Sequence, residues 1–325
     1  MKRREFIALA GGVAAWSFAV RAQQPAIPVI GYLSARSHDA EASVRTAILA
    51  ALEEAGFVAG HNVAIEYRFA EGREERLPML ASDLVRRAPT LLIATNQSSA
   101  LAVKAATTTI PIVFGVGEDP VEVGLARSLN RPGGNATGVS GLTSQLGPKR
   151  LGLLRELMPK SGLIAFVINP DTGSTPRQVE SLKAAAQSVA QTLLVVPAAT
   201  EAQVDEAFAT MAQRKVAGLI FSASPFYQVI MDKVITLAAQ HTIPAVYEWP
   251  VFVTAGGLMS YSTNRIEINR HVGSYAGRIL KGENPADLPI VQPTKFELVI
   301  NLKTAKALGL EIPATLLATA DEVIE

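Results

Sequence analysis

Strand-like apolar runs alternate with helix-like patterns along most of this chain, and no other feature limits its fold as strongly. In the first part, apolar runs at 27–33, 63–69, 90–94 and 110–114 are separated by segments whose apolar residues recur every three to four positions. Strands that alternate with helical patterns in this way are typical of βαβ units. The sequence therefore predicts an α/β fold with parallel sheets covered by helices on both faces.

The same order of elements returns in the second part of the chain. Strand patterns at 163–168, 193–196, 218–221 and 243–247 again alternate with helical ones, and TIPIVF at 109–114 matches TIPAVY 133 positions later. A proline at the first residue of a strand removes no ladder donor. At 325 residues the chain also exceeds the size at which one core keeps growing. We predict two similar Rossmann-like lobes in tandem.

The first 22 residues have the features of a secretory signal peptide. A basic start, MKRREF, precedes a mostly apolar stretch at 7–20, and small residues near Ala22 suit cleavage. The adjacent Arg3 and Arg4, with Arg21 before the cleavage point, resemble a twin-arginine signal, and ordinary Sec export is the alternative. A membrane anchor would need about 20 continuous apolar residues, which this stretch lacks. We expect an exported, periplasmic protein.

Charge and cysteine content exclude several classes of partner. Loss of the signal removes four basic residues and one acidic residue, which takes the net charge from +1 to −2. A chain with this charge has no electrostatic footprint for nucleic acid. It contains no cysteine, so neither a disulfide nor a lipid-modified cysteine contributes. We expect a soluble monomer.

Polar loops at the strand ends are the candidate site. In open parallel sheets, ligands bind beyond the carboxyl ends of the strands, near helix N-termini. Small hydroxyl and amide side chains there can bind a polar ligand or simply cap a helix. The aromatic residues Phe226, Tyr227 and Trp249 lie at the same level, where a planar ligand could stack. The loops are 34–37, 95–99 and 117–120 in the first lobe and 169–172, 222–227 and 248–250 in the second.

The stretch that follows the last strand of the first lobe, 117–138, resembles a short helix between loops. Asp119 before Pro120 is typical of a helix N-cap with proline in the first turn. Val121 and Leu125 would supply part of its buried side, and RPGGN would end it in a turn. We predict a helix there, after which the chain crosses to the second lobe near 138–141.

No catalytic or metal-binding constellation is present in the sequence. The four histidines are scattered without metal-ligand spacing, and nucleotide-binding and nucleophile motifs are absent. Glu118 and Asp119 could serve acid–base chemistry, but Asp119 is better explained as a cap. The sequence predicts no enzyme, no cofactor and no metal.

Four stretches resemble the ABC-transporter substrate-binding proteins of the periplasmic type I class, the group that includes aromatic amino acid binders. The most specific is the pattern DPVxxGLxxSLxxPGGNxTG, and together they span essentially the whole mature chain. They are GFVAGHNVAIEYRFAEG, IPIVFGVGEDPVEVGLARSLNRPGGNATGVS, RILKGENPADLPI and KFELVINLKTAKALGLEIP.

This resemblance implies a Venus-flytrap architecture, in which a ligand binds between two lobes and hinge closure is recognised by a membrane permease. A ligand that contacts both lobes favours the closed state by its differential affinity for it. The crossovers would lie near 138–141, 258–261 and 287–294. The lobes would comprise 27–139 plus 262–287 and 140–261 plus 288–325.

The resemblance also implies ligand contacts from the strand-end loops. A family acid that can follow the second crossover is Asn264 here, so a carboxylate for a ligand amine is missing at that position. Glu248, Glu118 or Asp171 could replace it, or the ligand could be an uncharged or anionic aromatic molecule. The implied ligand-binding residues are Ser34, Asn96, Gln97, Ser98, Glu118, Asn169, Ser222, Phe226, Glu248 and Asn264.

Taken together, the residues and the resemblance predict the periplasmic solute-binding component of an ABC importer. It would capture a small ligand, aromatic or amino-acid-like, between its lobes and deliver it to a permease in the inner membrane. The alternative is a ligand-sensing periplasmic subunit that docks on a membrane receptor. An enzyme on the same fold would need a convergent acid, base or nucleophile, and none stands out.

Overall fold

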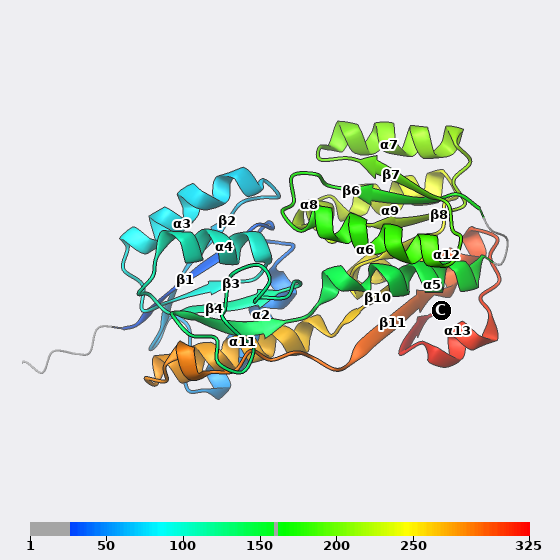
Figure 1. Ribbon diagram of the computed structural model, residues 1–325. Coiled ribbons are helices and arrows are strands. Elements are labelled where there is room, and N and C mark those ends of the chain that lie inside the picture. The colour runs from blue at the N-terminus through cyan, green and yellow to red at the C-terminus, as the bar shows by residue number, and fades with distance from the viewer. Residues whose placement is uncertain (1–26, 159–161) are drawn as a thin grey trace, which may run out of the picture.

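The computed structural model describes residues 27–158 and 162–325, which form two α/β lobes side by side (Figure 1). The predicted signal peptide and its cleavage point at Ala22 lie outside these residues. All neighbouring strands of the first sheet are parallel, in the order β2-β1-β3-β4-β5. They are β1 (Val29–Ser34), β2 (Ala64–Phe69), β3 (Leu91–Ala94), β4 (Ile112–Val116) and β5 (Ala136–Ser140).

Helices cover both faces of the first sheet, because its strands present apolar side chains on both sides. One face packs against α2 (Ala42–Glu54) and α11 (Arg265–Leu280). The other packs against α3 (Leu77–Arg86) and α4 (Gln97–Ala106). Short 3₁₀ turns, η2 (Glu74–Arg76) and η4 (Pro285–Asp287), complete the lobe.

Close packing of α11 on α2 fixes the start of α11 relative to the first sheet. A Cβ atom at Gly273 would lie 2.3 Å from the carbonyl oxygen of Ile48, and one at Gly277 would lie 2.4 Å from the Cβ of Ala55. Glycines one turn apart on α11 therefore allow the two helices to touch along their backbones. This contact holds Arg265, the first residue of α11, at the edge of the first lobe.

The second sheet has seven strands in the order β12-β11-β10-β9-β8-β6-β7, and only the β10–β11 pair is antiparallel. One face packs against α7, α8 and α9, and the other against α5, α6, α12 and α13. The strands are β6 (Ile164–Ile168), β7 (Leu193–Pro197), β8 (Gly218–Phe221), β9 (Ala245–Tyr247), β10 (Met259–Thr263), β11 (Phe296–Asn301) and β12 (Glu322–Ile324). The helical segments are η3 (Thr143–Leu146), α5 (Gly147–Leu157), α6 (Thr175–Ser188), α7 (Glu201–Gln213), α8 (Pro225–Val229), α9 (Met231–Gln240), α10 (Pro250–Thr254), α12 (Leu302–Ala307) and α13 (Ala314–Thr319).

The predicted duplication is present in the strand order. β7-β6-β8-β9-β10 repeats the arrangement β2-β1-β3-β4-β5 of the first sheet. The matching TIPxV segments have matching roles, since Pro111 and Pro244 each accept a 2.8 Å hydrogen bond, from the amides of Leu92 and Leu219. The strands begin one residue after each proline, so the prolines precede β4 and β9.

The chain passes between the lobes at three places. β5 ends at Ser140 in the first sheet and η3 begins the second lobe at Thr143. The strand β10 belongs to the second sheet through Thr263, and α11 returns to the first lobe. Residues 288–291 still pack on the first lobe before β11. The lobe boundaries given by the resemblance, 27–139 plus 262–287 and 140–261 plus 288–325, stay a prediction.

The helix predicted after Asp119 was wrong. Asp119 does receive a cap-like bond from the amide of Val121, at 2.8 Å, but one turn later Gly124 has φ +77° and no α-helix forms before β5. The helical segment that follows β8 is divided at Ile230 into α8 and α9. Within the described ranges, no helix combines the length and the apolar character needed to cross a membrane.

Candidate ligand-binding site

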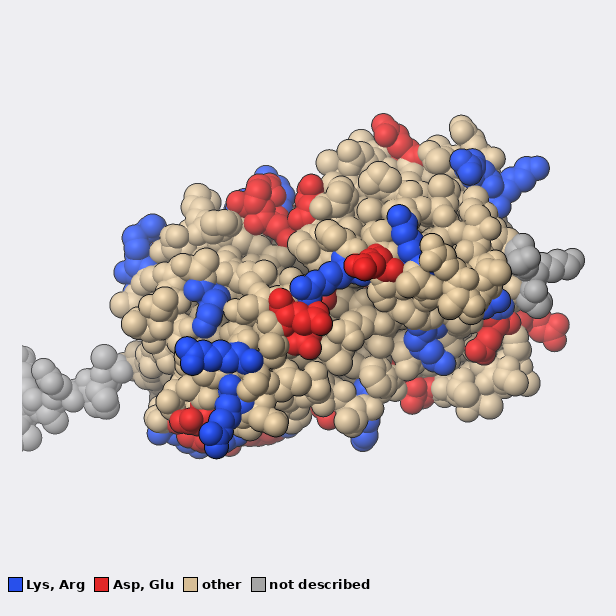
Figure 2. Space-filling model, in the orientation of Figure 1, with Lys and Arg blue, Asp and Glu red and all other residues tan. Residues whose placement is uncertain are grey.

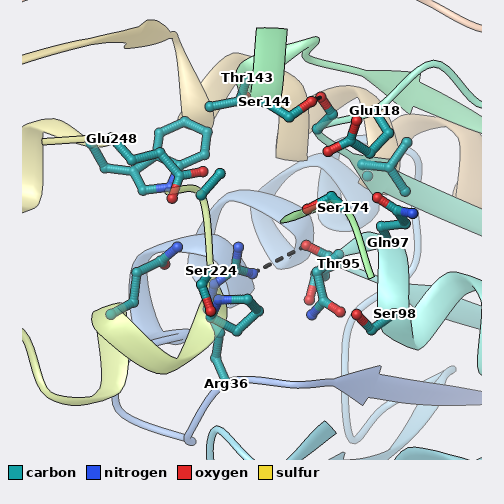
Figure 3. A pocket seen from close by; sticks show the side chains of 18 of the residues that line it. Arg36, Thr95, Gln97, Ser98, Glu118, Thr143, Ser144, Ser174, Ser224 and Glu248 are labelled. Carbon is teal, nitrogen blue, oxygen red and sulfur yellow. Dashed lines mark hydrogen bonds between the residues drawn. The ribbon is translucent and has the colours of Figure 1, made fainter. Parts of the chain in front are cut away.

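A partly open cavity lies between the two lobes and is lined by both (Figure 3). The space open to the centres of water-sized spheres is about 80 Å³. The first lobe contributes the loops after β1, β3 and β4 and the start of α11. The second contributes the loops after β6, β8 and β9, and Thr143 and Ser144 lie between the two.

Strand order explains why these loops meet. In each sheet the first strand lies between the second and the third, so the connections leave in opposite directions at that point and open a crevice at the carboxyl ends. The two crevices face each other across the cavity. Polar side chains on the loops that border them therefore converge from strands far apart in the sequence.

Half of the predicted ligand-binding residues line the cavity. They are Asn96, Gln97, Ser98, Glu118 and Glu248. Asn96 is also the N-cap of α4, because its side chain accepts a hydrogen bond from the amide of Ser99. Asn96 therefore both caps a helix and lines the cavity.

The other predicted residues lie outside the lining. Ser34 and Ser222 are buried behind it, where their hydroxyls accept bonds from the amides of Arg36 and Asn169. Asn169 itself donates to Ser224, which is the residue that reaches the cavity. Asn264 is the N-cap of α11 and does not line the cavity. Asp171, the other carboxylate considered, is exposed.

The aromatic residues behave differently from one another. Phe226 packs against the core of the second lobe, and the buried hydroxyl of Tyr227 donates to the carbonyl of Ala198. Neither lines the cavity, so the prediction for Phe226 is not supported by its position. Trp249 does, and the guanidinium of Arg265 lies 5.2 Å from its ring centre.

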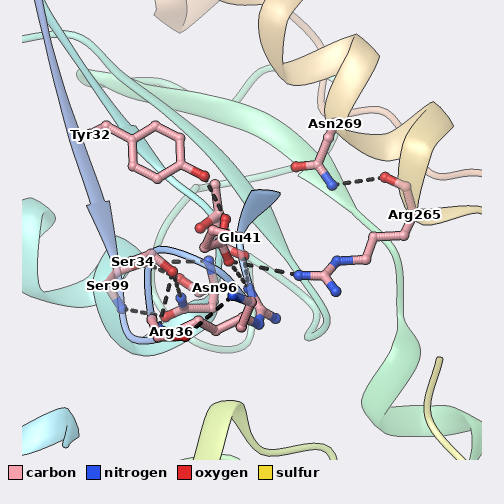
Figure 4. A network of polar contacts seen from close by, with 11 residues as sticks. Tyr32, Ser34, Arg36, Glu41, Asn96, Ser99, Arg265 and Asn269 are labelled. Carbon is pink, nitrogen blue, oxygen red and sulfur yellow. Dashed lines mark hydrogen bonds and ion pairs between the residues drawn. The ribbon is translucent and has the colours of Figure 1, made fainter. Parts of the chain in front are cut away.

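Two arginines line the cavity on the side of the first lobe and share one buried carboxylate (Figure 4). Nη1 of Arg36 donates to Oε1 of Glu41 at 2.7 Å and to the carbonyl of Thr95 at 3.1 Å. Nη2 of Arg265 lies 3.7 Å from the same Oε1. Burial opposes ionisation of Glu41, but Arg36 and Arg265 hold its pKa below the ordinary value. We name these three residues the basic cluster.

Glu118 and Glu248 also line the cavity, and neither forms an ion pair within 4 Å among the described residues. Burial raises the pKa of Glu118, although the hydroxyls of Ser144 and Ser174 oppose this. Burial also raises the pKa of Glu248, against the attraction of Arg150. The charge of Glu248 adds to the rise in the pKa of Glu118. We name these two residues the acidic pair.

Several polar atoms at the cavity are buried without a hydrogen-bond partner among the described residues. An unpaired buried donor or acceptor costs about 1–3 kcal/mol, so these atoms favour a polar occupant, whether water or a ligand. They include Nε of Arg36, Nη2 of Arg265, Oγ1 of Thr95, Oε1 of Gln97, Oε1 of Gln228 and Nε1 of Trp249.

The two lobes also touch each other directly around the cavity. Oγ1 of Thr172 donates to Oε1 of Glu74 at 3.3 Å, and Arg177 forms an ion pair with Glu122 at 2.6 Å. In the space-filling view, acidic and basic side chains are interspersed over both lobes (Figure 2). In the described part of the chain, no group of three or more acidic or histidine side chains is arranged to hold a metal ion.

Sequence reasoning missed the two arginines. Arg36 lies in the candidate loop 34–37, but the resemblance implied Ser34 as the ligand-binding residue of that loop. Arg265 directly follows Asn264, which the resemblance implied as a ligand-binding residue. No local signal separates a buried arginine from an exposed one, because burial depends on the distant partner Glu41.

Comparison with known proteins gives a consistent result. The family described as ABC transporter substrate binding protein matches residues 29–324. A tyrosine-binding protein of Clostridioides difficile (strain R20291) is 28% identical over 288 residues, which cover 87% of this chain and 81% of that protein.

Two solved structures differ in how well they fit the whole chain. A domain from Streptococcus pneumoniae in complex with L-Trp is 25% identical, with a TM-score of 0.81 over 91% of this chain and 100% of that one. The ligand-free, open structure of a substrate binding protein with adhesive properties from Clostridium difficile is 27% identical, with a TM-score of 0.64 over 92% of this chain and 99% of that one. At similar identity, the structure described here therefore superposes better on the complex with L-Trp than on the ligand-free, open structure.

Proposed function

This chain belongs to the family of ABC transporter substrate binding proteins, and from that membership we propose that it is the periplasmic component of an importer. It captures a small solute between its lobes, closes around it and delivers it to a permease in the inner membrane. The observation that carries the proposal is the cavity between the lobes, which takes lining residues from both.

Closure follows from how the contacts are divided. A solute bound only to one lobe would have the same affinity for the open and the closed state and would shift nothing. A solute that touches Arg36 on one lobe and Glu248 on the other gains contacts only on closure. The direct contacts between Thr172 and Glu74 and between Arg177 and Glu122 form in the same state.

The proposal also states where the protein acts and which membrane protein it meets. The predicted signal peptide would export the protein, by a twin-arginine or a Sec route, into the periplasm. There it would act as a monomer and present the closed pair of lobes to the permease. Binding, without chemical change of the solute, is the function expected of such a component.

Native mass spectrometry tests capture. The protein purified from the periplasm is compared with the same protein after unfolding and refolding. We expect a stoichiometric small-molecule adduct that disappears on refolding. If no adduct is found and no metabolite in a broad panel raises the melting temperature, the proposal of capture is wrong.

Uptake measurements test delivery. Deletion of the gene should abolish import of the solute identified as the adduct, and expression of the intact gene should restore it. If import is unchanged while a response to that solute is lost, the protein instead serves the membrane receptor of the alternative interpretation.

A further inference from the structure

The charges at the cavity specify the class of solute more closely than the family does. We propose, on the premise that the cavity is the solute site, that the solute is a compact, non-aromatic zwitterion such as a small α-amino acid. Its ammonium group would lie between Glu118 and Glu248, and its carboxylate would face Arg36 and Arg265.

The acidic pair is the reason for placing the ammonium group of the solute between Glu118 and Glu248. Glu118 comes from the first lobe and Glu248 from the second, both side chains line the cavity, and both residues are more than nine-tenths buried. A buried carboxylate is costly unless a cation or several donors compensate it. Since neither carboxylate has an ion-pair partner among the described residues, a cation supplied by the solute would compensate both.

The basic cluster is the reason for placing the carboxylate of the solute opposite Arg36 and Arg265. Two guanidinium groups share the single carboxylate of Glu41, so one positive charge is left uncompensated. Burial lowers the pKa of Arg265 only to about 10, and it stays charged at neutral pH. Nε of Arg36 and Nη2 of Arg265 are buried donors without a hydrogen-bond partner among the described residues, and a carboxylate would satisfy them.

The sum of the charges excludes a simple anion. Counted together, the three arginines at and behind the cavity, Arg36, Arg150 and Arg265, are matched in number by Glu41, Glu118 and Glu248, so these groups leave no net positive charge for an anion. The next carboxylate, that of Glu74, bonds to the cavity residues Ser98 and Thr172 and adds negative charge. A solute with a negative net charge therefore fits these surroundings worse than a zwitterion does.

Cavity size limits the solute. The space open to the centres of water-sized spheres is about 80 Å³, which is well below the roughly 300–1,000 Å³ of pockets that hold drug-sized ligands. A small amino acid such as glycine, alanine or serine therefore fits this space better than tyrosine or tryptophan does.

The lining also offers little to an aromatic ring. Among the residues that line the cavity, Trp249 is the only aromatic one, and Arg265 already lies over its ring. Phe226 and Tyr227 are directed into the core of the second lobe. The solute class inferred here thus differs from the tyrosine and tryptophan named for the relatives.

Isothermal titration calorimetry on the refolded protein tests the inference, with glycine, L-alanine, L-serine and L-threonine as probes. We expect at least one of them to bind at least about tenfold more tightly than L-tyrosine and L-tryptophan. Two analogues of L-alanine, L-lactate without the ammonium group and ethylamine without the carboxylate, should each bind roughly a hundredfold more weakly than the amino acid.

Variants locate the ammonium group. Glu118→Gln and Glu248→Gln keep the side-chain shape, and each should weaken amino acid binding by roughly tenfold or more while L-lactate binding is unchanged or improved. Glu54→Gln is the matched control, because Glu54 is exposed and its ion pair with Arg270 is remote from the cavity lining. Melting curves establish that each variant folds.

The outcomes separate this inference from the proposed function. If L-tyrosine, L-tryptophan or a solute without an ammonium group is the one bound, the inference is overturned and solute capture stands. If L-lactate binds as tightly as L-alanine, or both glutamine variants bind like the unaltered protein, the ammonium assignment is wrong. If nothing binds and the purified protein carries no adduct, the proposed function fails as well.

Discussion

Arg265 at the start of α11 lies over the ring of Trp249, with its guanidinium carbon 5.2 Å from the ring centre. The two residues belong to opposite lobes, so this contact exists only while the lobes are together. Arg265 is at the same time within 3.7 Å of Glu41. One side chain therefore links the core of the first lobe, the cavity and the second lobe.

Trp249→Ala should weaken the closed state. A cation–π contact is worth about 0.5–2 kcal/mol depending on its exposure, so solute affinity should fall by roughly 2- to 30-fold, mainly through faster dissociation. Trp249→Phe keeps a ring under the guanidinium and should lose less. Stopped-flow dissociation rates measure both, and equal losses in the two variants would contradict a role for the ring.

Glu41→Gln should strongly destabilise the protein, because it leaves Arg36 and Arg265 buried without a counterion. Removing one partner of a buried pair costs about 3–5 kcal/mol, whereas Glu54→Gln at an exposed pair should cost under about 1 kcal/mol. Urea unfolding at neutral pH measures the free energies of unfolding.

The penalty of Glu41→Gln should also depend on pH. Because the pKa of Glu41 is lowered in the folded protein, its contribution is present above its unfolded pKa and is lost as the pH falls through its folded pKa. The unaltered protein should therefore lose its advantage over the variant in acid. A pH-independent difference would contradict the charged pair.

Solute affinity should fall as the pH is lowered. The pKa values of Glu118 and Glu248 are raised above the ordinary 4.5 by burial, and only their ionised forms attract an ammonium group. Binding should therefore release protons in the pH range just above 4.5, and calorimetry in buffers of different ionisation enthalpy detects this release. Proton uptake instead of release would exclude the proposed pairing.

In the solute-free protein, ionisation of Glu118 and Glu248 should lower the stability, whereas it raises the affinity for solute. A carboxyl whose folded pKa is raised binds its proton more tightly in the folded state, so its ionisation costs stability as the pH rises through that pKa. Glu248→Gln should accordingly raise the melting temperature of the solute-free protein at neutral pH. An unchanged melting temperature would indicate that Arg150 already compensates the charge.

Gly273→Ala should destabilise the first lobe by about 1–3 kcal/mol, because the new Cβ would meet the backbone of α2 at Ile48. Gly152→Ala is the matched control on a helix, since nothing lies within 4 Å of the added atom, and it should stabilise by about 0.5–1 kcal/mol. Thermal unfolding separates the two. Equal effects would mean that α11 and α2 move apart freely.

The order of elements could be predicted because it depends on local pattern alone. Each buried strand is a short apolar run, and Pro111 and Pro244 mark equivalent strands in both lobes. The helix predicted after Asp119 failed because the left-handed Gly124 stops the chain after one turn, which the apolar spacing of Val121 and Leu125 does not reveal.

The site could be predicted only as a set of loops. Glu118 and Glu248 line the cavity as expected, but Phe226 does not, since its direction is set by packing within the second lobe. Arg265 was missed because its burial depends on Glu41, which is far away in the sequence. Asn264 lies between β10 and α11, and the start of α11 uses its side chain as a cap.

The central claim, closure of two lobes around a small solute, is tested most directly by the distance between them in solution. The chain has no cysteine, so spin labels can be attached specifically at Asp39→Cys and Glu201→Cys, which are exposed on opposite sides of the groove between the lobes. Pulsed electron paramagnetic resonance then compares the refolded, labelled protein alone and with the proteinogenic amino acids added together. We predict a long or mixed distance that becomes a single shorter one on addition. A distance distribution that is the same in both samples would contradict the account.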